Sequence, residues 1–301
     1  MAQQRVAYVN GEIVPESQAM VSINDLGFLY GDAVFDTTRT FGHRIFRLRE
    51  HLDRLHTSLK YMRIDPGLTK DEMEDLTMQV LEANLPLLDE DDDYWVSQRV
   101  TRGVRGTDGG AKPTVVFECY PLPFVERARY YRDGLPVVTP SIRRTPPESM
   151  SPRAKVHNYI NMIQADMEVK SQNPDAWAIL LDVNGNIAEG MGSNFFIVKD
   201  GVLTTPRGQY VLAGISRQTT IELAHELNME VREADIDLYD AYTADEVFVT
   251  STSFCICPVS KVNGSRVSDG GVPGPVTDRL QKAYSGLVGI DIVGQYLSRL
   301  S

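Results

Sequence analysis

A proline-rich break at Pro121-Leu-Pro123 divides the chain into two stretches that each alternate short strands with helices. Proline has a fixed φ angle and no backbone N–H, so two prolines in three residues end a regular element. A chain of 301 residues is also long for one core and suits two domains. We therefore predict an α+β protein with an N-terminal α+β domain over residues 1–120, a connection over 121–134 and a C-terminal α/β domain over 135–301.

The N-terminal half contains local signals for both strands and helices. Asn10-Gly11 predicts a hairpin between strands at 7–10 and 12–14. Thr69 and Glu72 have the spacing of a capping box, which predicts the start of a helix over 69–85. Another helix is expected over 50–62, where leucines recur at helical spacing. Strands are expected at 33–41, 44–47, 94–103 and 114–120, and the acidic run 89–93 is expected to be a solvated loop.

The C-terminal half has the same mixture of elements. Asn184-Gly185 and Asp200-Gly201 predict tight turns between strands. Strands are expected at 135–140, 179–181 and 246–250, and helices at 158–170, 216–227 and 275–287. No sequence repeat of fixed period is present.

Charge and composition exclude several classes of function. A net charge of −11 argues against a nucleic-acid-binding surface. No apolar run has the length of a membrane span, and the amino terminus lacks a signal-peptide pattern, so the cytoplasm is the expected location and no membrane partner is expected. Three cysteines form no disulfide framework, and five scattered histidines indicate no metal site.

Two residues point to a specific chemistry because of the segments in which they occur. Lys155 lies in AKVHNYINM, just ahead of a predicted helix, and Glu189 opens EGMGSNFFIVKDG. Burial lowers the pKa of a lysine amine, which then forms a Schiff base with an aldehyde. Pyridoxal 5'-phosphate (PLP) requires such a lysine together with an acid that keeps its ring nitrogen protonated.

Both segments resemble those of the class IV aminotransferases, which are PLP enzymes of fold type IV, and the resemblance extends over roughly residues 5–290. It implies a two-domain fold similar to that of D-amino acid aminotransferase, with the active site in the interdomain cleft and the lysine carried by the C-terminal domain. It also implies a homodimer or a higher homo-oligomer.

The resemblance also implies roles for individual residues. Lys155 is the catalytic residue that carries PLP, and Glu189 contacts the ring nitrogen. Tyr159 is expected at the phenolic oxygen and Asn194 on the ring side of the site. The residues expected around the phosphate are Arg54, Ile215, Ser216 and Thr252.

Substrate contacts follow less directly from the sequence. Tyr30, Phe35 and Trp95 are candidates for an apolar side-chain pocket. The candidates for binding a substrate carboxylate are Arg39, the Ser253 amide and Arg105.

Two features depart from the pattern of the branched-chain aminotransferases, one group within class IV. Ser97 stands where branched-chain enzymes usually carry an arginine, and FDTTR replaces the FEGIR of that group. The VTRG and LGFLYGDAVFD segments are more similar to the D-amino acid and (R)-amine groups, although the RxH motif of the D-amino acid group is absent after Arg102.

These observations together predict a ping-pong transaminase that works through a lysine imine. It would move an amino group from a branched-chain or hydrophobic amino acid, or a primary amine, to a 2-oxo acid such as 2-oxoglutarate or pyruvate. A D-amino acid or (R)-selective amine transaminase is the alternative, and an aminodeoxychorismate lyase is a further one. If the protein is not an enzyme, the alternative is a non-catalytic binding module that retains the same fold.

Overall fold

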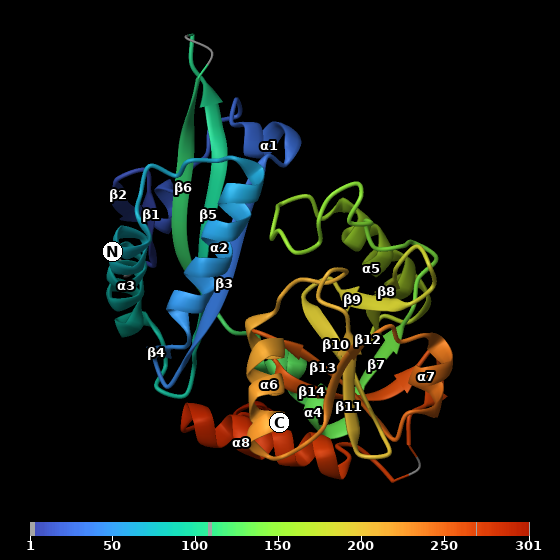
Figure 1. Ribbon diagram of the computed structural model, residues 1–301. Helices are drawn as coiled ribbons and strands as arrows, with labels where there is room; N and C mark the ends of the chain where they lie inside the picture. Colours follow the sequence, from blue (N-terminus) through green and yellow to red (C-terminus); the bar gives the residue numbers. More distant parts are fainter. Residues whose placement is uncertain (1–3, 108–109, 269, 301) are drawn as a thin grey trace. The chain divides into compact units, whose positions relative to one another are not determined.

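The computed structural model describes residues 4–107, 110–268 and 270–300, which fall into two units (Figure 1). The first unit comprises Met1–Leu122 together with Ala154–Asn158. The second comprises Pro123–Arg153 and Tyr159–Ser301. The chain leaves the first unit inside the predicted connection, but residues 124–133 of that connection form a helix of the second unit.

The first unit is built on a six-stranded sheet with the strand order β2-β1-β6-β5-β3-β4. All neighbouring strands of this sheet are antiparallel. Its strands are β1 (Val6–Val9), β2 (Glu12–Pro15), β3 (Ala33–Phe41), β4 (Arg44–Ile45), β5 (Tyr94–Arg105) and β6 (Ala111–Pro121). Its α-helices are α1 (Leu26–Tyr30), α2 (Leu48–Met62) and α3 (Lys70–Asn84), and two short 3₁₀ turns span Glu16–Gln18 and Leu85–Leu87.

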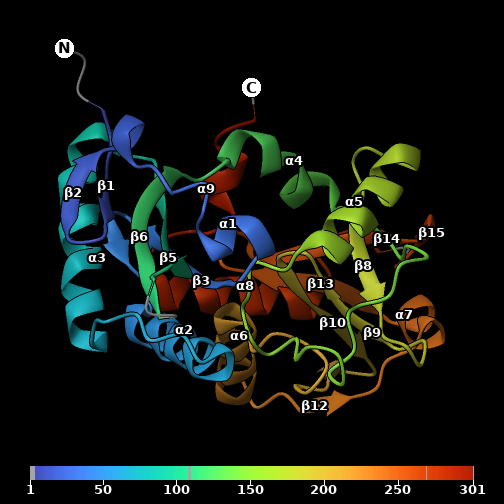
Figure 2. The same cartoon turned by 90° about the horizontal axis from the view of Figure 1, so that it is seen from above.

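Helices α2 and α3 pack on one face of this sheet, as Figures 1 and 2 show. Leu52, Leu55 and Leu59 of α2 are buried, which confirms the apolar face predicted from their spacing. Thr69 caps α3 through the predicted capping box with Glu72. The core of the unit therefore lies between the two helices and the sheet.

The first unit differs from the predictions in three places. The LGFLY segment forms α1, for which no element was predicted, and the Asp25 carboxylate caps this helix at the Gly27 amide (2.7 Å). β5 and β6 run further into their hairpin than expected, so Arg105 pairs with Ala111 at the end of β5. Asp93, expected in a solvated loop, is completely buried.

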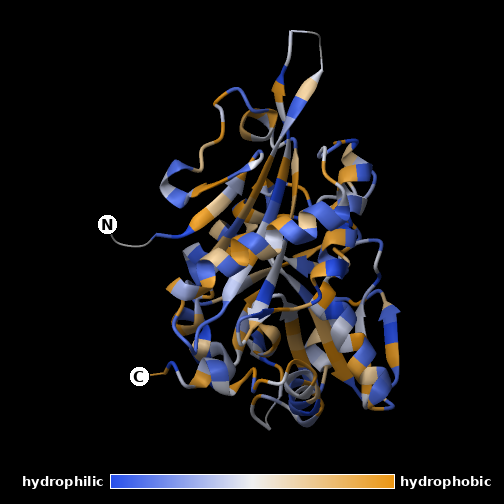
Figure 3. Ribbon diagram, turned by 90° about the vertical axis from the view of Figure 1, so that its left-hand side faces the viewer, coloured by the Kyte–Doolittle hydropathy of each residue, from blue (hydrophilic) through white to orange (hydrophobic). Residues whose placement is uncertain are grey.

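The second unit is built on a nine-stranded sheet that closes on itself. Its path is β12-β11-β10-β13-β14-β7-β8-β9, and β9 pairs back onto β10, while β15 pairs with β14. The strands are β7 (Leu135–Val138), β8 (Trp177–Leu181), β9 (Ile187–Gly190), β10 (Ser193–Lys199), β11 (Val202–Pro206), β12 (Val231–Ala234), β13 (Glu246–Ser251), β14 (Cys255–Val262) and β15 (Ser265–Arg266). In Figure 3, hydrophobic residues concentrate in the strands.

Helices surround this closed sheet. They are α4 (Phe124–Asp133), α5 (Ile160–Gln172), α6 (Ile215–Glu226), α7 (Leu238–Thr243), α8 (Pro275–Val288) and α9 (Gly294–Leu297). Helix α5 packs on β8, α6 on β13 and α8 on β14, while α4 and α9 pack on each other. The free thiols of Cys255 and Cys257 are buried in β14, where they pack as apolar groups.

Candidate active site

Lys155 lies in a short segment that the structure assigns to the first unit and not to the C-terminal domain predicted from the sequence. Val156 forms a β-bridge with Val34, and the Phe35 amide donates a hydrogen bond to the Lys155 carbonyl (3.0 Å). The Lys155 amide in turn donates to Ser58 Oγ of α2 (3.0 Å). The lysine backbone is thus fixed on both sides by buried elements of this unit.

The Lys155 side chain is directed onto an aromatic ring. Its Nζ atom lies 4.5 Å from the centroid of the Phe35 ring, and the residue is half-buried. A cation–π contact of this kind attracts an ammonium group to the face of the ring and so helps to position it. Phe35 itself is half-buried on β3, as a residue of a substrate pocket would be.

Arg54, the predicted phosphate residue of this unit, is held by a buried carboxylate. Its Nε and Nη2 atoms donate to the two Asp36 oxygens at 2.8 and 2.7 Å, and His51 Nδ1 lies 2.7 Å from Asp36 Oδ1. Burial on its own raises the pKa of the Asp36 carboxyl, but Arg54 and His51 outweigh it and hold that pKa well below its ordinary value. The paired edge of the guanidinium is therefore fixed in one orientation.

Arg39 occupies a different environment from the one that a substrate carboxylate requires. Its side chain is 1% exposed, stacks on Phe41 at 4.0 Å, and pairs with Asp93 (Nη2–Oδ2, 3.3 Å). Asp93 also accepts from Thr40 Oγ1 (2.6 Å) and the His43 amide (3.1 Å). These contacts assign Arg39 to the core, so we do not include it in the proposed substrate site.

The other candidate substrate residues of this unit are more accessible. Trp95 is half-buried on β5, directly opposite Arg39 on β3. Tyr30, at the end of α1, is 71% exposed. Arg105 is exposed at the end of β5.

In the second unit, Glu189 is a buried acceptor on β9. Its Oε1 atom accepts from Arg144 Nε (2.9 Å), and its Oε2 atom accepts from the Leu212 amide (2.9 Å) and Asn194 Nδ2 (3.5 Å). Asn194 is the residue paired with Glu189 across β9 and β10. These donors, which come from three separate parts of the unit, hold the Glu189 carboxylate in one orientation.

The N-terminus of α6 has the properties of an anion site. The helix has 12 residues, no side-chain cap and no acidic residue in its first turn, so the amides of Ile215 and Ser216 lie at an uncompensated positive end. Ser216 Oγ donates to the Ser251 carbonyl (2.9 Å), which ties this turn to the end of β13, just before Thr252.

Gly214, the N-cap of α6, has no room for a side chain. A Cβ atom there would lie 2.1 Å from Asn194 Oδ1, and Asn194 is itself held by the Leu212 carbonyl (3.0 Å). We expect Gly214→Ala to lower the free energy of unfolding by about 1–3 kcal/mol. Urea denaturation would measure this, with Gly286→Ala, where a Cβ meets nothing within 4 Å, as the control. Equal stability of the two variants would contradict the packing described for Gly214.

The loop around Ser253 is anchored by three side chains. Arg127 Nη1 donates to Ser253 Oγ, Tyr296 donates to the Ser253 carbonyl (2.6 Å), and Tyr131 donates to the Phe254 carbonyl. Tyr159, at the N-cap of α5, is half-buried against the cluster that contains Met162. The contacts of Arg127, Tyr296 and Tyr131 hold the backbone around Ser253 in place. The sequence predicts that this backbone takes part in phosphate and carboxylate binding.

Several polar partners of the candidate residues were not predicted from the sequence. Arg144 orients Glu189 and Asp36 orients Arg54, and each lies far from its partner in the sequence. Asp36 belongs to the FDTTR segment, but no role was predicted for it. Thr250 Oγ1 is buried and has no hydrogen-bond partner among the described residues, although Thr250 stands opposite Asn194 in the sheet. An unpartnered hydroxyl beside Asn194 fits a polar ligand at this position.

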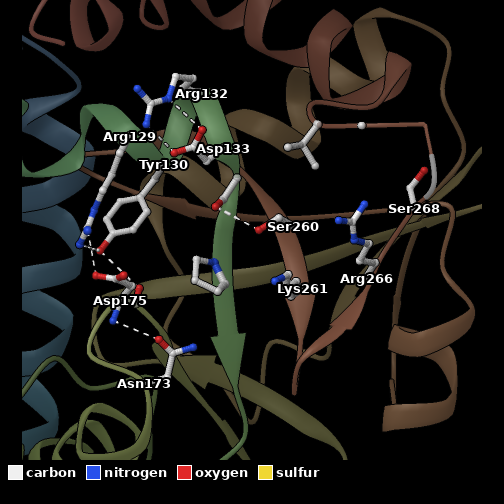
Figure 4. A pocket seen from close by; sticks show the side chains of 14 residues that line it. Arg129, Tyr130, Arg132, Asp133, Asn173, Asp175, Ser260, Lys261, Arg266 and Ser268 are labelled. Carbon is white, nitrogen blue, oxygen red and sulfur yellow. Dashed lines mark hydrogen bonds and ion pairs between the residues drawn. The ribbon is translucent and has the colours of Figure 1, made fainter. Parts of the chain in front are cut away.

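A separate pocket of about 730 Å³ lies in the second unit (Figure 4). Two of its cations are neutralised, since Arg129 pairs with Asp175 (2.8 Å) and Arg132 with Asp133 (2.8 Å). Lys261 and Arg266 are the exposed cations at its other side. None of the candidate site residues lines it, so it is distinct from the groups around Lys155 and Glu189.

Comparison with known proteins identifies the family to which this chain belongs. Residues 33–262 match the family model "Amino-transferase class IV". A protein of Methanocaldococcus jannaschii, named provisionally as a branched-chain-amino-acid aminotransferase, is 40% identical over 282 residues, which cover 92% of this chain and 94% of that protein. The Escherichia coli K12 branched-chain-amino-acid aminotransferase is 34% identical, and the match covers 95% of this chain and 94% of that protein. The chain belongs to the class IV aminotransferases.

Solved structures agree with the family assignment. A branched-chain amino acid aminotransferase from T.th., complexed with N-(5'-phosphopyridoxyl)-L-glutamate, superposes with a TM-score of 0.85 at 28% identity, and 96% of each chain is covered. The fold is therefore the predicted two-domain α+β fold of type IV, and the protein is an aminotransferase. Among the residues described, no helix combines the length and apolarity needed to cross a membrane, and no cluster of three potential metal ligands was found.

Proposed function

We propose that this aminotransferase uses PLP to move the amino group of a branched-chain or other hydrophobic L-amino acid to a 2-oxo acid. The observation that carries the proposal is the fixed Lys155, whose amine lies on the half-buried Phe35 ring within a matching family segment. The branched-chain names of the relatives that cover almost the whole chain support the substrate.

The chain contains residues suited to each part of PLP. The Ile215 and Ser216 amides, Thr252 and Arg54 would hold the phosphate, and Glu189 would accept a hydrogen bond from the ring nitrogen. The unpartnered Thr250 hydroxyl and the uncapped α6 N-terminus fit such a polar, anionic group. When bound, PLP supplies an electron sink for the carbon that loses its proton.

We assign each part of the reaction to particular residues of the chain. Lys155 Nζ would hold the cofactor and would move the proton at the reacting carbon as general base and acid. Arg144 and the Leu212 amide hold the Glu189 carboxylate in place. Phe35 and Trp95 offer apolar surface for a hydrocarbon side chain.

A substrate panel tests the proposal. Purified enzyme with added PLP is assayed with L-amino acids, D-amino acids and (R)- and (S)-1-phenylethylamine, each with pyruvate and 2-oxoglutarate. We expect the highest kcat/KM for L-leucine, L-isoleucine or L-valine. Faster turnover of a D-amino acid or an (R)-amine would overturn the substrate assignment, and release of pyruvate from aminodeoxychorismate without an acceptor would indicate the lyase.

The homodimer expected for the family has a candidate contact surface on the first unit. Residues 20–30 expose a run of apolar side chains, including Met20 (76%), Ile23 (75%) and Phe28 (70%). Such a concentration in one short segment is typical of an interaction site. We propose that a second copy of the chain covers it.

Phe28→Asp is expected to convert the proposed dimer largely to monomer, because it places a charge inside a desolvated apolar contact. Light scattering coupled to size-exclusion chromatography measures the mass. Tyr239→Asp, an equally exposed aromatic on α7, serves as the control and should leave the mass unchanged. A dimer that persists in the Phe28 variant would exclude this segment as the interface.

A further inference from the structure

The separate pocket of the second unit is lined mainly by charged and polar side chains (Figure 4). Its lining comes from the end of α4, the start of β7, the loop after α5, and the β14–β15 hairpin with the segment that follows it. Its volume of about 730 Å³ lies in the range of pockets that hold small molecules. The pocket therefore has the size of a ligand site that is distinct from the candidate active site.

The lining of this pocket is positively charged, although the chain as a whole has a net charge of −11. Four cationic side chains and two carboxylates line it, which gives the lining a net charge of +2: Arg129, Arg132, Lys261 and Arg266, with Asp133 and Asp175. A hollow lined by one sign of charge concentrates ions of the opposite sign. The charge balance of the pocket thus favours an anionic ligand.

Two of these cations, Lys261 and Arg266, stand directly opposite each other on β14 and β15. Like charges at opposite positions of antiparallel strands destabilise the pair. Both residues are exposed, and among the residues that the structure describes neither side chain has an ion pair or a hydrogen bond. An anion bound between the two cations would replace their repulsion with two attractions.

The backbone of β14 presents Lys261 on the pocket side. Two consecutive residues of β7 pair with Val259 and Lys261, so Ser260 is an extra residue in β14. Val259 and Val262 are both buried although they are three residues apart, and Lys261 is exposed between them. An inserted residue of this kind changes the direction of the side chains that follow it. Ser260 Oγ donates to the Gly134 carbonyl (3.1 Å), which ties the insertion to the start of β7.

Two neutral side chains of the pocket use their acceptor atoms within the protein. Asn173 Oδ1 accepts from the Asp175 amide (3.2 Å), and Ser268 Oγ accepts from the Gly270 amide (3.0 Å). The Asn173 Nδ2 group and the Ser268 hydroxyl hydrogen have no acceptor among the described residues. Both carboxylates of the lining are paired with arginines. The groups that remain for a ligand are therefore mainly donors, which suits a ligand with several acceptor oxygens.

We propose that this pocket is a second ligand site, which binds a small molecule through a phosphate group held between Lys261 and Arg266. A phosphate monoester has a charge of about −1.5 to −2 at pH 7 and three acceptor oxygens, so one compact group meets both cations. The charges of a dicarboxylate are instead spread along a carbon chain. Pro136 and Val272 offer apolar surface for the organic part of the ligand. This site lies outside the proposed transaminase function and does not depend on it.

Calorimetry with pyrophosphate on the PLP-loaded enzyme, at constant ionic strength, tests the proposal. PLP then fills the phosphate site proposed for the cofactor, so pyrophosphate reports on the second site. We expect saturable binding to one site per chain. Lys261→Gln combined with Arg266→Gln should raise Kd about tenfold or more, since two charged hydrogen bonds are lost. The matched control combines Arg232→Gln with Lys282→Gln, two exposed cations elsewhere in this unit, and should change Kd less than about twofold.

Thermal unfolding gives a second readout that a purely structural role would move differently. Without ligand, the variant that lacks Lys261 and Arg266 should have at least the Tm of the wild type, because it loses a like-charge pair. Pyrophosphate should raise the Tm of the wild type and of the control, and leave that of this variant unchanged. A lower Tm of the ligand-free variant would assign a structural role to the two cations and contradict the proposal.

Absence of saturable pyrophosphate binding up to about 10 mM, or an equal loss of affinity in the two double variants, would overturn the proposal. Succinate separates the two classes of dianion. Binding that disappears without Lys261 and Arg266 should be tighter for pyrophosphate than for succinate. The opposite order would show that the pocket takes a dicarboxylate and that the phosphate assignment is wrong.

Discussion

Lys155→Ala is expected to lower kcat by about 10⁴-fold or more, because in the proposed function its amine both holds the cofactor and transfers the proton at the reacting carbon. The purified variant should also lack the visible absorbance of a lysine-bound cofactor. The backbone of this residue is fixed by Phe35 and Ser58, so the substitution should remove the amine without displacing the segment.

The measurement combines steady-state kinetics with an absorbance spectrum after PLP is added. Lys60→Ala, an exposed lysine in the last turn of α2, is the control and should retain both signals. Normal turnover by Lys155→Ala would refute the assignment of this residue and, with it, the proposed mechanism.

Asp36→Asn is expected to lower the free energy of unfolding by about 3–5 kcal/mol, since it leaves Arg54 buried without its carboxylate. The pKa of Asp36 is depressed in the folded state, so its contribution is complete above its ordinary pKa of about 3.9. That contribution is lost only as the pH falls from there toward the depressed value. The stability difference between wild type and variant should therefore be constant near neutrality and shrink in acid.

Urea unfolding at a series of pH values tests this expectation. Asp71→Asn breaks the exposed ion pair with Arg49 (2.6 Å) and is the matched control, with a much smaller effect expected because solvent screens it. A difference that grows as the pH falls would contradict the assigned ionisation of Asp36. Weaker PLP binding by the variant would show in addition that Asp36 orients Arg54 for the phosphate.

Features encoded by local contacts were predictable from the sequence. The Thr69 capping box and the apolar face of α2 involve residues within one or two turns of each other, so spacing alone reveals them. The family and fold followed from the Lys155 and Glu189 segments, and the comparisons confirm both. The roles of the individual site residues remain proposals.

Features that depend on distant partners were not predictable. Asp93 belongs to an acidic run that favours solvent, yet it is buried because Arg39, on another strand, neutralises it. Arg144 meets Glu189, which lies 45 residues further along the chain, only through the tertiary structure. A single sequence gives no signal for such pairs, because their residues are far apart along the chain and the burial that makes them strong arises from tertiary structure.

The five residues Ala154–Asn158 have a consequence for synthesis on the ribosome. The first 122 residues emerge before the segment that bridges Val34, so the first unit lacks Lys155 until some thirty more residues have been translated. At 5–20 residues per second, that interval lasts roughly a few seconds. A nascent chain that is halted there would hold Asp36 and Arg54 without Lys155, which joins the first unit only when translation has entered the second.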